Sequence, residues 1–331
     1  MHAFVTGASG FVGINLVREL VAQQWQVTIL VRETSKLDDL RDLPLHIAYG
    51  DISNADSVNA AMPAGVDAVF HVAASTSIWS ANNEQQTRTN VDGTKNVIHA
   101  ALLAGAHRLI HVSSFVVYGF QSGTITEDTP RITNADWINY VTTKQSAEVL
   151  VKEAIEQDGL DAVILNPAHI MGPYDRHNWA RMLIMVSRGK LPGVPSGAGS
   201  FADVREIARA AIQAFHHGRT GQNYLLGGTD AAFVDVVQIA GKLTGQKVPG
   251  RPTPAWLIRM IGRLKVLAAR VTGNEPDLTP EGAAMVTQHI MCDSSLAIRE
   301  LAYKNTPIEE LVTDTYSWLR SAGLLPKNGD E

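Results

Sequence analysis

A tyrosine and a lysine lie four residues apart in the segment Tyr140-Val141-Thr142-Thr143-Lys144. At helical spacing, both side chains project from one face of a helix. A phenol has a pKa of about 10, which is too high for easy proton exchange at neutral pH. A neighbouring ammonium favours the phenolate and lowers that pKa. The pair therefore predicts a tyrosine that gives and takes a proton, although the same spacing also occurs by chance on exposed helix faces.

A second group capable of chemistry stands at the end of the strand predicted at 108–112. Ser113 and Ser114 follow this strand, and Ser114 precedes Tyr140 by 26 residues. A hydroxyl at a strand end can donate a hydrogen bond to a substrate carbonyl and orient it. The sequence thus places a serine, a tyrosine and a lysine where they can act together on an oxygen atom.

A glycine-rich turn near the start of the chain predicts a nucleotide-binding site. It joins an apolar strand (3–6) to an amphipathic helix (14–22). Gly7 allows a sharp bend, Gly10 lets a pyrophosphate approach the backbone, and Gly13 lets the helix pack close to the strand. The N-terminus of the helix then presents free N–H groups to phosphates. A turn without a ligand is the alternative, which the strand–turn–helix context disfavours.

The composition describes an ordinary globular protein. The chain has 331 residues, 45% hydrophobic and 18% charged, which fits one large α/β domain or a core domain with a smaller lobe. A formal net charge of −5 argues against nucleic-acid binding. Cys292 is the only cysteine, so no internal disulfide is expected, and no spacing predicts a metal site. Because the first strand leaves no room for a signal peptide, we expect a cytoplasmic protein.

Strands and helices alternate through the first half of the chain. Strands are predicted at 3–6, 26–31, 46–48, 68–71, 108–112 and 162–165, and helices at 14–22, 89–104 and 139–157. This alternation predicts an α/β fold with a Rossmann-type, doubly wound parallel sheet. We assign residues 1–166 to a dinucleotide-binding domain, to which 201–229 return with a helix at 201–215 and a strand at 224–226. Residues 167–200, with a loop at 192–199, and 230–331 are expected to form a smaller, mainly helical substrate lobe.

Together these motifs resemble the extended short-chain dehydrogenases/reductases, the superfamily of NAD-dependent epimerases and dehydratases, and especially its dihydroflavonol-4-reductase-like members. The resemblance runs from Thr6 to about Pro173. It implies that Tyr140 is the catalytic acid/base and that Lys144 tunes it and holds the nicotinamide ribose. It also implies that Ser114, rather than Ser113, orients the substrate carbonyl.

The resemblance also assigns the cofactor contacts. It places Asp51 beside the adenine, although an aspartate there could instead cap a helix. It implies structural roles for Asn90 and for His71. It places Pro167, in the pair Asn166-Pro167, near the nicotinamide carboxamide. The predicted cofactor-binding residues are Thr6, Gly7, Ser9, Gly10, Phe11, Val12, Gly13, Arg32, Lys36, Asp51, Ile52, Val72, Ala73, Ala74, Tyr140, Lys144 and Pro167.

The residue after the second strand bears on the choice of cofactor. NAD-preferring members often end this strand with an acid that binds the ribose diol. Here Val31 stands at that position and Arg32 follows. A cation at this position, with no carboxylate beside it, suits the 2′-phosphate of NADP. Lys36 or Ser35 could also bind that phosphate. The alternative is that Arg32 is only a surface charge. We therefore predict NADP as the cofactor, with NAD as the alternative.

The residues expected around the site are largely apolar, which suits an apolar or aromatic carbonyl compound. They are Trp79, Phe115, Phe120, Trp137, Met171, Trp179, Met182 and Met185. The sequence thus predicts an NADP(H)-dependent carbonyl reductase or alcohol dehydrogenase with a small-molecule substrate. One alternative is an NAD-dependent sugar-nucleotide epimerase, whose substrate diphosphate would need cations such as Arg176, Arg181, Arg205 and Arg251. The other is a non-catalytic NADP sensor.

The segment 256–271 predicts a cationic amphipathic helix without acids. Its charges, Arg259, Arg263, Lys265 and Arg270, argue against a membrane span. The favoured interpretation is a lobe helix with a solvated basic face, and the alternative is contact with an anionic membrane surface or substrate. Many members of the resembling family form homodimers through two helices per subunit, here 89–104 and 139–157, while others are monomers. The resemblance therefore allows a homodimer and leaves the monomer open.

Overall fold

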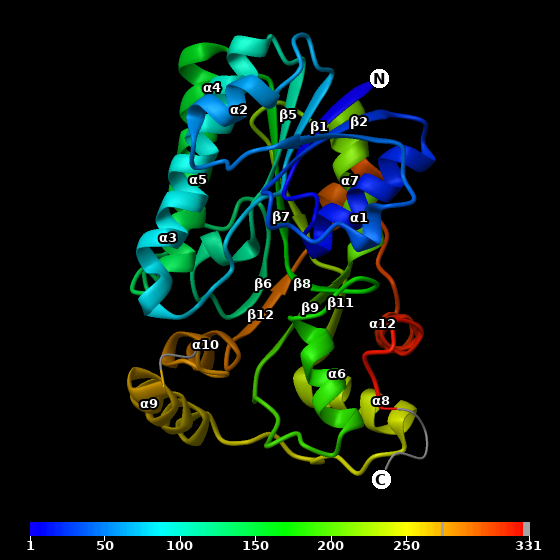
Figure 1. Ribbon diagram of the computed structural model, residues 1–331. Helices are drawn as coiled ribbons and strands as arrows, with labels where there is room; N and C mark the ends of the chain where they lie inside the picture. The colour runs from blue at the N-terminus through cyan, green and yellow to red at the C-terminus, as the bar shows by residue number, and fades with distance from the viewer. Residues whose placement is uncertain (273–274, 327–331) are drawn as a thin grey trace.

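A seven-stranded parallel sheet forms the centre of the larger domain, in the upper half of Figure 1. Its strand order is β10-β7-β5-β4-β1-β2-β3, and each neighbouring pair is parallel. The computed structural model that shows it describes residues 1–272 and 275–326. The strands are β1 (His2–Thr6), β2 (Gln26–Val31), β3 (Leu45–Tyr49), β4 (Ala68–His71), β5 (Arg108–Val112), β7 (Ala162–Pro167) and β10 (Asn223–Leu226). The predicted Rossmann-type α/β fold is confirmed.

The order of the strands changes direction between β1 and β4. The chain adds β2 and β3 on one side of β1 and then crosses to β4 and the later strands on the other side. Such a switch point opens a crevice at the carboxyl ends of the strands, where ligands of doubly wound sheets bind. Since β1 ends at Thr6 and β4 at His71, the glycine turn and the segment after His71 meet at this crevice.

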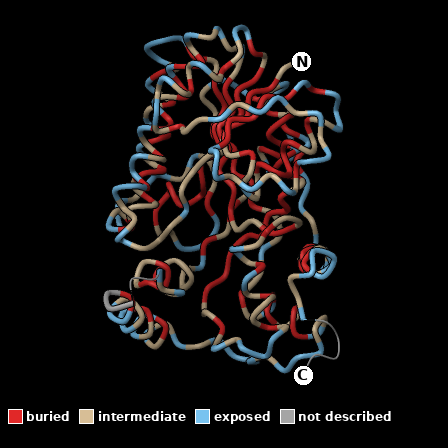
Figure 2. The backbone as a smooth tube through the Cα atoms, in the orientation of Figure 1, coloured by how far each residue is buried: buried red, intermediate tan, exposed pale blue. Residues whose placement is uncertain are grey.

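Helices cover both faces of the sheet (Figure 1). One face packs against α1 (Phe11–Ala22), α7 (Val204–His217) and α11 (Ser295–Leu301). The other packs against α2 (Ala55–Ala61), α4 (Gly93–Ala104) and α5 (Asn139–Asp158). The inner strands are therefore buried on both sides, as the red segments in the centre of Figure 2 show, and they are largely apolar. The edge strand β3 leaves Ile47 and Tyr49 exposed. Full burial of each large apolar side chain contributes about 1.5–3 kcal/mol before entropy is counted.

A second sheet, which the sequence did not predict, connects the two parts of the molecule. Its order is β11-β9-β12-β6, and β8 also pairs with β9. These strands are β6 (Gly123–Ile125), β8 (His169–Met171), β9 (Ala198–Asp203), β11 (Thr229–Ala232) and β12 (His289–Cys292). The helix expected from residue 201 was wrong at its start, because Phe201 and Ala202 are fully buried in β9. The α7 helix begins at Val204, where Asp203 Oδ1 accepts a hydrogen bond of 2.8 Å from the Arg205 N–H.

The remaining helices form the lower lobe in Figure 1. They are α6 (Trp179–Ser187), α8 (Phe233–Thr244), α9 (Ala255–Thr272), α10 (Pro280–Met285) and α12 (Ile308–Ser321). α6, α8 and α12 enclose a separate apolar core around Leu183, Val236 and Leu311. Within the described ranges, no helix is both long enough and apolar enough to cross a bilayer.

The outer surface of α9 carries the solvated basic residues that the sequence favoured, since Arg259 and Arg263 are exposed. It also carries large apolar side chains, because Trp256, Met260, Leu264 and Leu267 are all exposed. The helix buries its opposite side, including Ile258, against α10. The exposed face therefore combines apolar and basic residues, and we return to it below.

Candidate active site

The glycine turn brings the backbone of β1 against the segment that follows β4. Gly7 has a φ of +73°, and a Cβ built on it would lie 2.6 Å from the Ala73 nitrogen. A Cβ on Gly13 would lie 2.1 Å from the Gly7 carbonyl oxygen. Only glycine fits at either position without moving the backbone. The two glycines thus allow the close packing of strand, turn and helix that the sequence predicts.

The third glycine leaves the start of α1 open to a ligand. Gly10 is the exposed N-cap of α1 and provides no side-chain cap. A Cβ on Gly10 would meet only the Gly7 carbonyl oxygen, at 3.2 Å. Uncapped N–H groups at the positive end of a helix dipole bind phosphate. The residues of the turn therefore fit the pyrophosphate of a dinucleotide.

The predicted adenosine contacts stand at the next two strand ends. Arg32 and Lys36 are exposed just beyond β2, and the Arg32 N–H donates to Ser35 Oγ at 3.1 Å. Asp51 follows β3, and its Oδ1 accepts hydrogen bonds from the N–H and the hydroxyl of Ser53 at 2.9 and 2.8 Å. Asn54, rather than Asp51, caps α2. Asp51 therefore shapes the turn before α2 and stays close to the adenine side of the predicted site.

The predicted catalytic residues meet at the carboxyl end of β5. Ser114 follows this strand, while Tyr140 and Lys144 come from the first two turns of α5. Lys144 is 3% exposed, and its Nζ donates a hydrogen bond of 2.8 Å to the Val112 carbonyl oxygen. An ammonium has three N–H donors, so this bond fixes the side chain and leaves further donors for a ligand.

Burial raises the pKa of Tyr140 above its usual value, and the hydroxyl of Ser114 acts in the opposite direction. Burial lowers the pKa of Lys144 itself to about 8, which Glu148 partly opposes. Lys144 lies one turn further along α5 than Tyr140, and the lowering of the Tyr140 pKa by Lys144 stays a prediction.

The loop beyond β4 is fixed by amide side chains. Asn90 lies in a π-helical turn (Arg88–Asp92) between α3 (Asn83–Thr87) and α4. Its Nδ2 donates to the Ser75 carbonyl at 3.0 Å and to Thr143 Oγ1 at 3.1 Å, and its Oδ1 accepts from the Ser75 N–H at 2.7 Å. Gln86 Nε2 donates to Ser75 and Ser77 carbonyls. Asn90 thus ties the loop after Val72, Ala73 and Ala74 to the helix that carries Tyr140.

His71 has the structural position expected of it. Its ring nitrogens hydrogen-bond Thr6 Oγ1 at 2.8 Å and Thr94 Oγ1 at 2.9 Å. Burial, with Lys144 nearby, lowers its pKa to about 3. The His111 ring lies 5.3 Å away, and burial lowers its pKa as well. Both imidazoles are therefore neutral and part of the core beneath Lys144.

A buried polar network behind Ser114 was missed by the sequence reasoning. Glu148 is fully buried and pairs with Arg131. Asn166 Nδ2 donates to Glu148 Oε1 at 2.6 Å and to the Ser114 carbonyl at 3.1 Å. Asn223 Nδ2 donates to Glu148 Oε2 at 3.1 Å and to Asn166 Oδ1 at 2.8 Å. Asn166 therefore supports the serine loop. The available signal was Glu148 itself, a carboxylate one turn beyond Lys144 on the same helix face.

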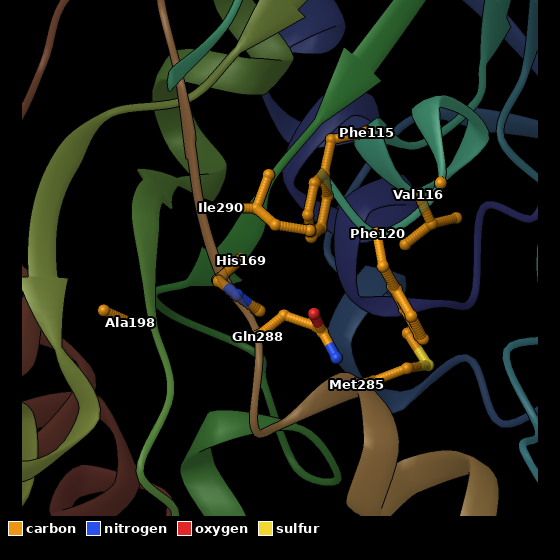
Figure 3. A pocket seen from close by; sticks show the side chains of 9 residues that line it. Phe115, Val116, Phe120, His169, Ala198, Met285, Gln288 and Ile290 are labelled. Carbon is orange, nitrogen blue, oxygen red and sulfur yellow. The ribbon is translucent and has the colours of Figure 1, made fainter. Parts of the chain in front are cut away.

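An apolar cavity lies between the turn after β5 and the second sheet, and Figure 3 shows its side chains pointing inward. It is lined by Phe115, Val116, Gly119, Phe120, His169, Ala198, Met285, Gln288 and Ile290. Tyr140 packs against the same apolar cluster as Phe120 and Met285. Burial lowers the pKa of His169 to about 4, so this imidazole is a neutral polar group in an apolar wall.

The structure divides the predicted pocket residues into four groups. Phe115 and Phe120 line the apolar cavity, while Trp137 borders a smaller polar cavity that also contacts Tyr140. Trp79 and Met185 line neither of these two cavities. Met171, Trp179 and Met182 instead pack into the core of the lobe. The second sheet supplies the residues that were missed, because β8, β9 and β12 bring His169, Ala198 and Ile290 to the cavity.

The arginines suggested for a substrate diphosphate are mostly engaged. Ion pairs join Arg176 to Asp39 at 3.1 Å, Arg181 to Asp277, and Arg205 to both Asp203 and Asp314. Arg176 also stacks 5.1 Å from the Trp318 ring. A diphosphate would have to compete with these carboxylates for the N–H donors of the arginines.

The short-chain dehydrogenases/reductases have this arrangement, in which a nucleotide-binding turn lies near a tyrosine and a lysine on one helix. Comparison with known proteins places the chain in this class of NAD(P)-dependent enzymes. Residues 3–227 match the sequence model of the NAD dependent epimerase/dehydratase family, so the chain belongs to this family. It is 30% identical, over 97% of its length and 95% of the relative's, to a protein of Synechocystis sp. provisionally named dihydroflavonol 4-reductase.

Two further similarities cover almost the whole chain. Sterol demethylase protein B of Methylococcus capsulatus is 30% identical over 98% of this chain and 100% of its own length. The crystal structure of gox2253 superimposes with a TM-score of 0.84 at 30% identity, covering 98% of this chain and 99% of that one. The smaller lobe is therefore shared with these proteins as well as the dinucleotide-binding domain.

Proposed function

We propose that this protein is an NADP(H)-dependent carbonyl reductase or alcohol dehydrogenase that acts on an apolar or aromatic ketone or aldehyde. The observation that carries the proposal is the apolar cavity lined by Phe115, which follows Ser114 in the chain, and by Phe120 and Met285, which share an apolar cluster with Tyr140. Its walls offer aromatic and aliphatic carbon with few polar groups, which suits a largely apolar ligand. The names of the two relatives support a largely apolar substrate, because dihydroflavonols and sterols are both ring systems rich in carbon.

In the proposed reaction, a bound nicotinamide supplies or accepts a hydride at the carbonyl carbon. The protein handles the oxygen: Tyr140 donates the proton in reduction and accepts it in oxidation. Ser114 hydrogen-bonds the same oxygen and fixes its position. Lys144, held by the Val112 carbonyl, presents its remaining donors to the cofactor ribose. Burial of Tyr140 keeps the phenol protonated at neutral pH, which suits a general acid in the direction of reduction.

The cofactor preference is proposed from the exposed cations beyond β2. Arg32 and Lys36 are positioned to meet a 2′-phosphate, and one lost charge-assisted contact costs about 1.5–3 kcal/mol. Arg32→Ala should therefore lower NADPH affinity by about 10- to 150-fold and leave NADH affinity nearly unchanged. Lys95→Ala, an exposed cation on α4, is the matched control. Equal NADPH-to-NADH ratios in wild type and Arg32→Ala would remove Arg32 from this role.

The decisive assay for the function is a panel of aromatic and aliphatic aldehydes and ketones with NADPH and NADH, run beside UDP-sugars without added cofactor. Reduction of a carbonyl compound with NADPH supports the proposal and excludes a sensor. Epimerisation of a UDP-sugar with tightly held NAD would favour the epimerase instead. The ion pairs of Arg176, Arg181 and Arg205 argue against that second outcome.

A further inference from the structure

The exposed face of α9 carries an unusual concentration of apolar side chains. Trp256, Met260, Leu264 and Leu267 have exposed fractions of 66, 44, 59 and 61%. They account for four of the eleven large hydrophobic residues that are exposed in the described ranges. Their spacings of three and four residues place them along a single stripe of the helix. Contiguous apolar surface of this kind marks a contact site rather than ordinary surface.

Cations border this stripe and have no acid on the helix to balance them. Arg259 and Arg263 are exposed and, at 100° per residue, lie beside the stripe on one flank. The sequence of α9 contains no aspartate or glutamate. Of the acids that follow α9 in the chain, Glu275 accepts a hydrogen bond from Ser77 at 2.9 Å, and Asp277 pairs with Arg181 and with Lys265 of α9 itself. Among the described residues, no ion pair involves Arg259 or Arg263. The positive charge of Arg259 and Arg263 is therefore available to an outside partner.

The position of α9 leaves this surface accessible. The helix lies at the outer edge of the lobe, with α10 on its inner side, in the lower left of Figure 1. Ile258 and Gly262 are buried on the inner side, and a Cβ on Gly262 would lie 2.9 Å from the Thr279 carbonyl oxygen. The helix is thus anchored by its inner side, and its eighteen residues present a face about 27 Å long.

We propose that α9 docks on an anionic lipid membrane, with the stripe of Trp256, Met260, Leu264 and Leu267 in the interface and with Arg259 and Arg263 on lipid phosphates. An apolar face with tryptophan and leucine, bordered by arginine, is the pattern of interfacial helices. The charge argues for lipid over a second copy of this chain, because two copies paired through α9 would bring like charges together without an acid between them. The protein would lie on the membrane without crossing it.

The docking surface is connected to the active site through α10. Thr279, the N-cap of α10, donates a hydrogen bond of 2.8 Å to the Ile78 carbonyl, in the loop that borders Tyr140. Met285, at the end of α10, lines the apolar cavity. A bilayer under α9 would bring this cavity close to the phase in which apolar carbonyl compounds dissolve. This consequence rests on the proposed function, whereas the membrane contact does not.

Co-sedimentation of the full chain with vesicles tests the proposal without any substrate. Wild type should bind vesicles of phosphatidylcholine and phosphatidylglycerol (3:1) at low salt and leave them at 0.5 M NaCl. It should bind pure phosphatidylcholine far less. Arg259→Gln/Arg263→Gln should lower binding to anionic vesicles about thirtyfold, since each basic residue near such a surface is worth about 1 kcal/mol. Leu264→Ser/Leu267→Ser should lower it at least about tenfold.

Matched controls separate the α9 surface from general effects. Ile298→Ser and Lys95→Gln change an exposed apolar residue and an exposed cation outside α9, and both should bind as wild type does. Brominated lipid should quench tryptophan emission in wild type and much less in Trp256→Phe. Wild type that stays in the supernatant, or α9 variants that bind as well as wild type, would overturn the proposal. If wild type is instead a dimer that Leu264→Ser/Leu267→Ser dissociates, the surface belongs to a second copy and the proposal also fails.

Discussion

Replacement of Glu148 by glutamine should lower both the stability and the turnover of this protein. The carboxylate is fully buried, pairs with Arg131 and accepts hydrogen bonds from Asn166 and Asn223. Glutamine keeps the shape but replaces one acceptor oxygen by an NH2 group, which would face either Asn166 Nδ2 or the donors of both Arg131 and Asn223. The substitution therefore removes a charge and opposes at least one donor at the same time.

The expected loss of stability follows from the exposure of Glu148 and Arg131. Breaking a buried ion pair by removing one partner costs about 3–5 kcal/mol. The Arg131 side chain is 31% exposed, so water can partly solvate it, and we expect a loss of about 2–3 kcal/mol. For a chain of 331 residues, this corresponds to a fall in Tm of about 3–4 °C.

Turnover should change because the network supports Ser114. Asn166 donates to both Glu148 and the Ser114 carbonyl, so Glu148 is a positioning residue. We expect kcat to fall about tenfold, as a small displacement of an orienting group costs this much or more, while dinucleotide affinity stays near that of wild type. Calorimetry, steady-state kinetics and cofactor titration measure the three quantities. Glu153→Gln, an exposed carboxylate on the same helix, is the control. Wild-type stability and kcat in Glu148→Gln would refute the reasoning.

Two further predictions concern the glycine turn and the buried lysine. Gly13→Ala should destabilise the protein by about 1–3 kcal/mol or more and abolish dinucleotide binding, because its Cβ would lie 2.1 Å from the Gly7 carbonyl oxygen. Gly250→Ala is the control, because a Cβ at Gly250 has nothing within 4 Å. Denaturant melts and cofactor titration should show no change for this control. Burial lowers the pKa of Lys144 to about 8 from 10.5. Between pH 8 and pH 10 the lysine is therefore protonated more in the unfolded chain than in the folded protein. Because the unfolded state binds more protons, the stability of wild type relative to Lys144→Met should rise from pH 8 to pH 10. Urea melts of both proteins across this range test it, and a constant or falling difference would contradict the assigned pKa.

The sheet was predictable from the sequence because its signals are local. Apolar runs such as 68–71 and 108–112, each followed by a turn and a helix, identify buried parallel strands without knowledge of the rest of the chain. The close contact of Gly13 with Gly7 likewise follows from one short segment, whereas that of Gly7 with Ala73 joins segments distant in the sequence. This region belongs to the part of the chain that matches the family.

The second sheet and the polar network could not be predicted because they depend on residues distant in the sequence. β9 pairs with β8, β11 and β12, and no local pattern shows that Phe201 will lie in a strand rather than in a helix. The network joins Arg131, Glu148, Asn166 and Asn223 from four segments. The exposed apolar stripe of α9 was not predicted for a related reason. Periodicity shows that a helix has two faces, but only packing against α10 shows which face is buried.

The most direct test of the central claim is the turnover of Tyr140→Phe on a carbonyl compound that wild type reduces. The change removes one hydroxyl, so the fold and the dinucleotide affinity should remain. The account predicts that kcat falls at least about a hundredfold, the usual scale for a lost general acid. Ser114→Ala should also lower kcat with little change in dinucleotide affinity, whereas Lys144→Met should weaken both. Wild-type turnover in Tyr140→Phe would contradict the proposed chemistry.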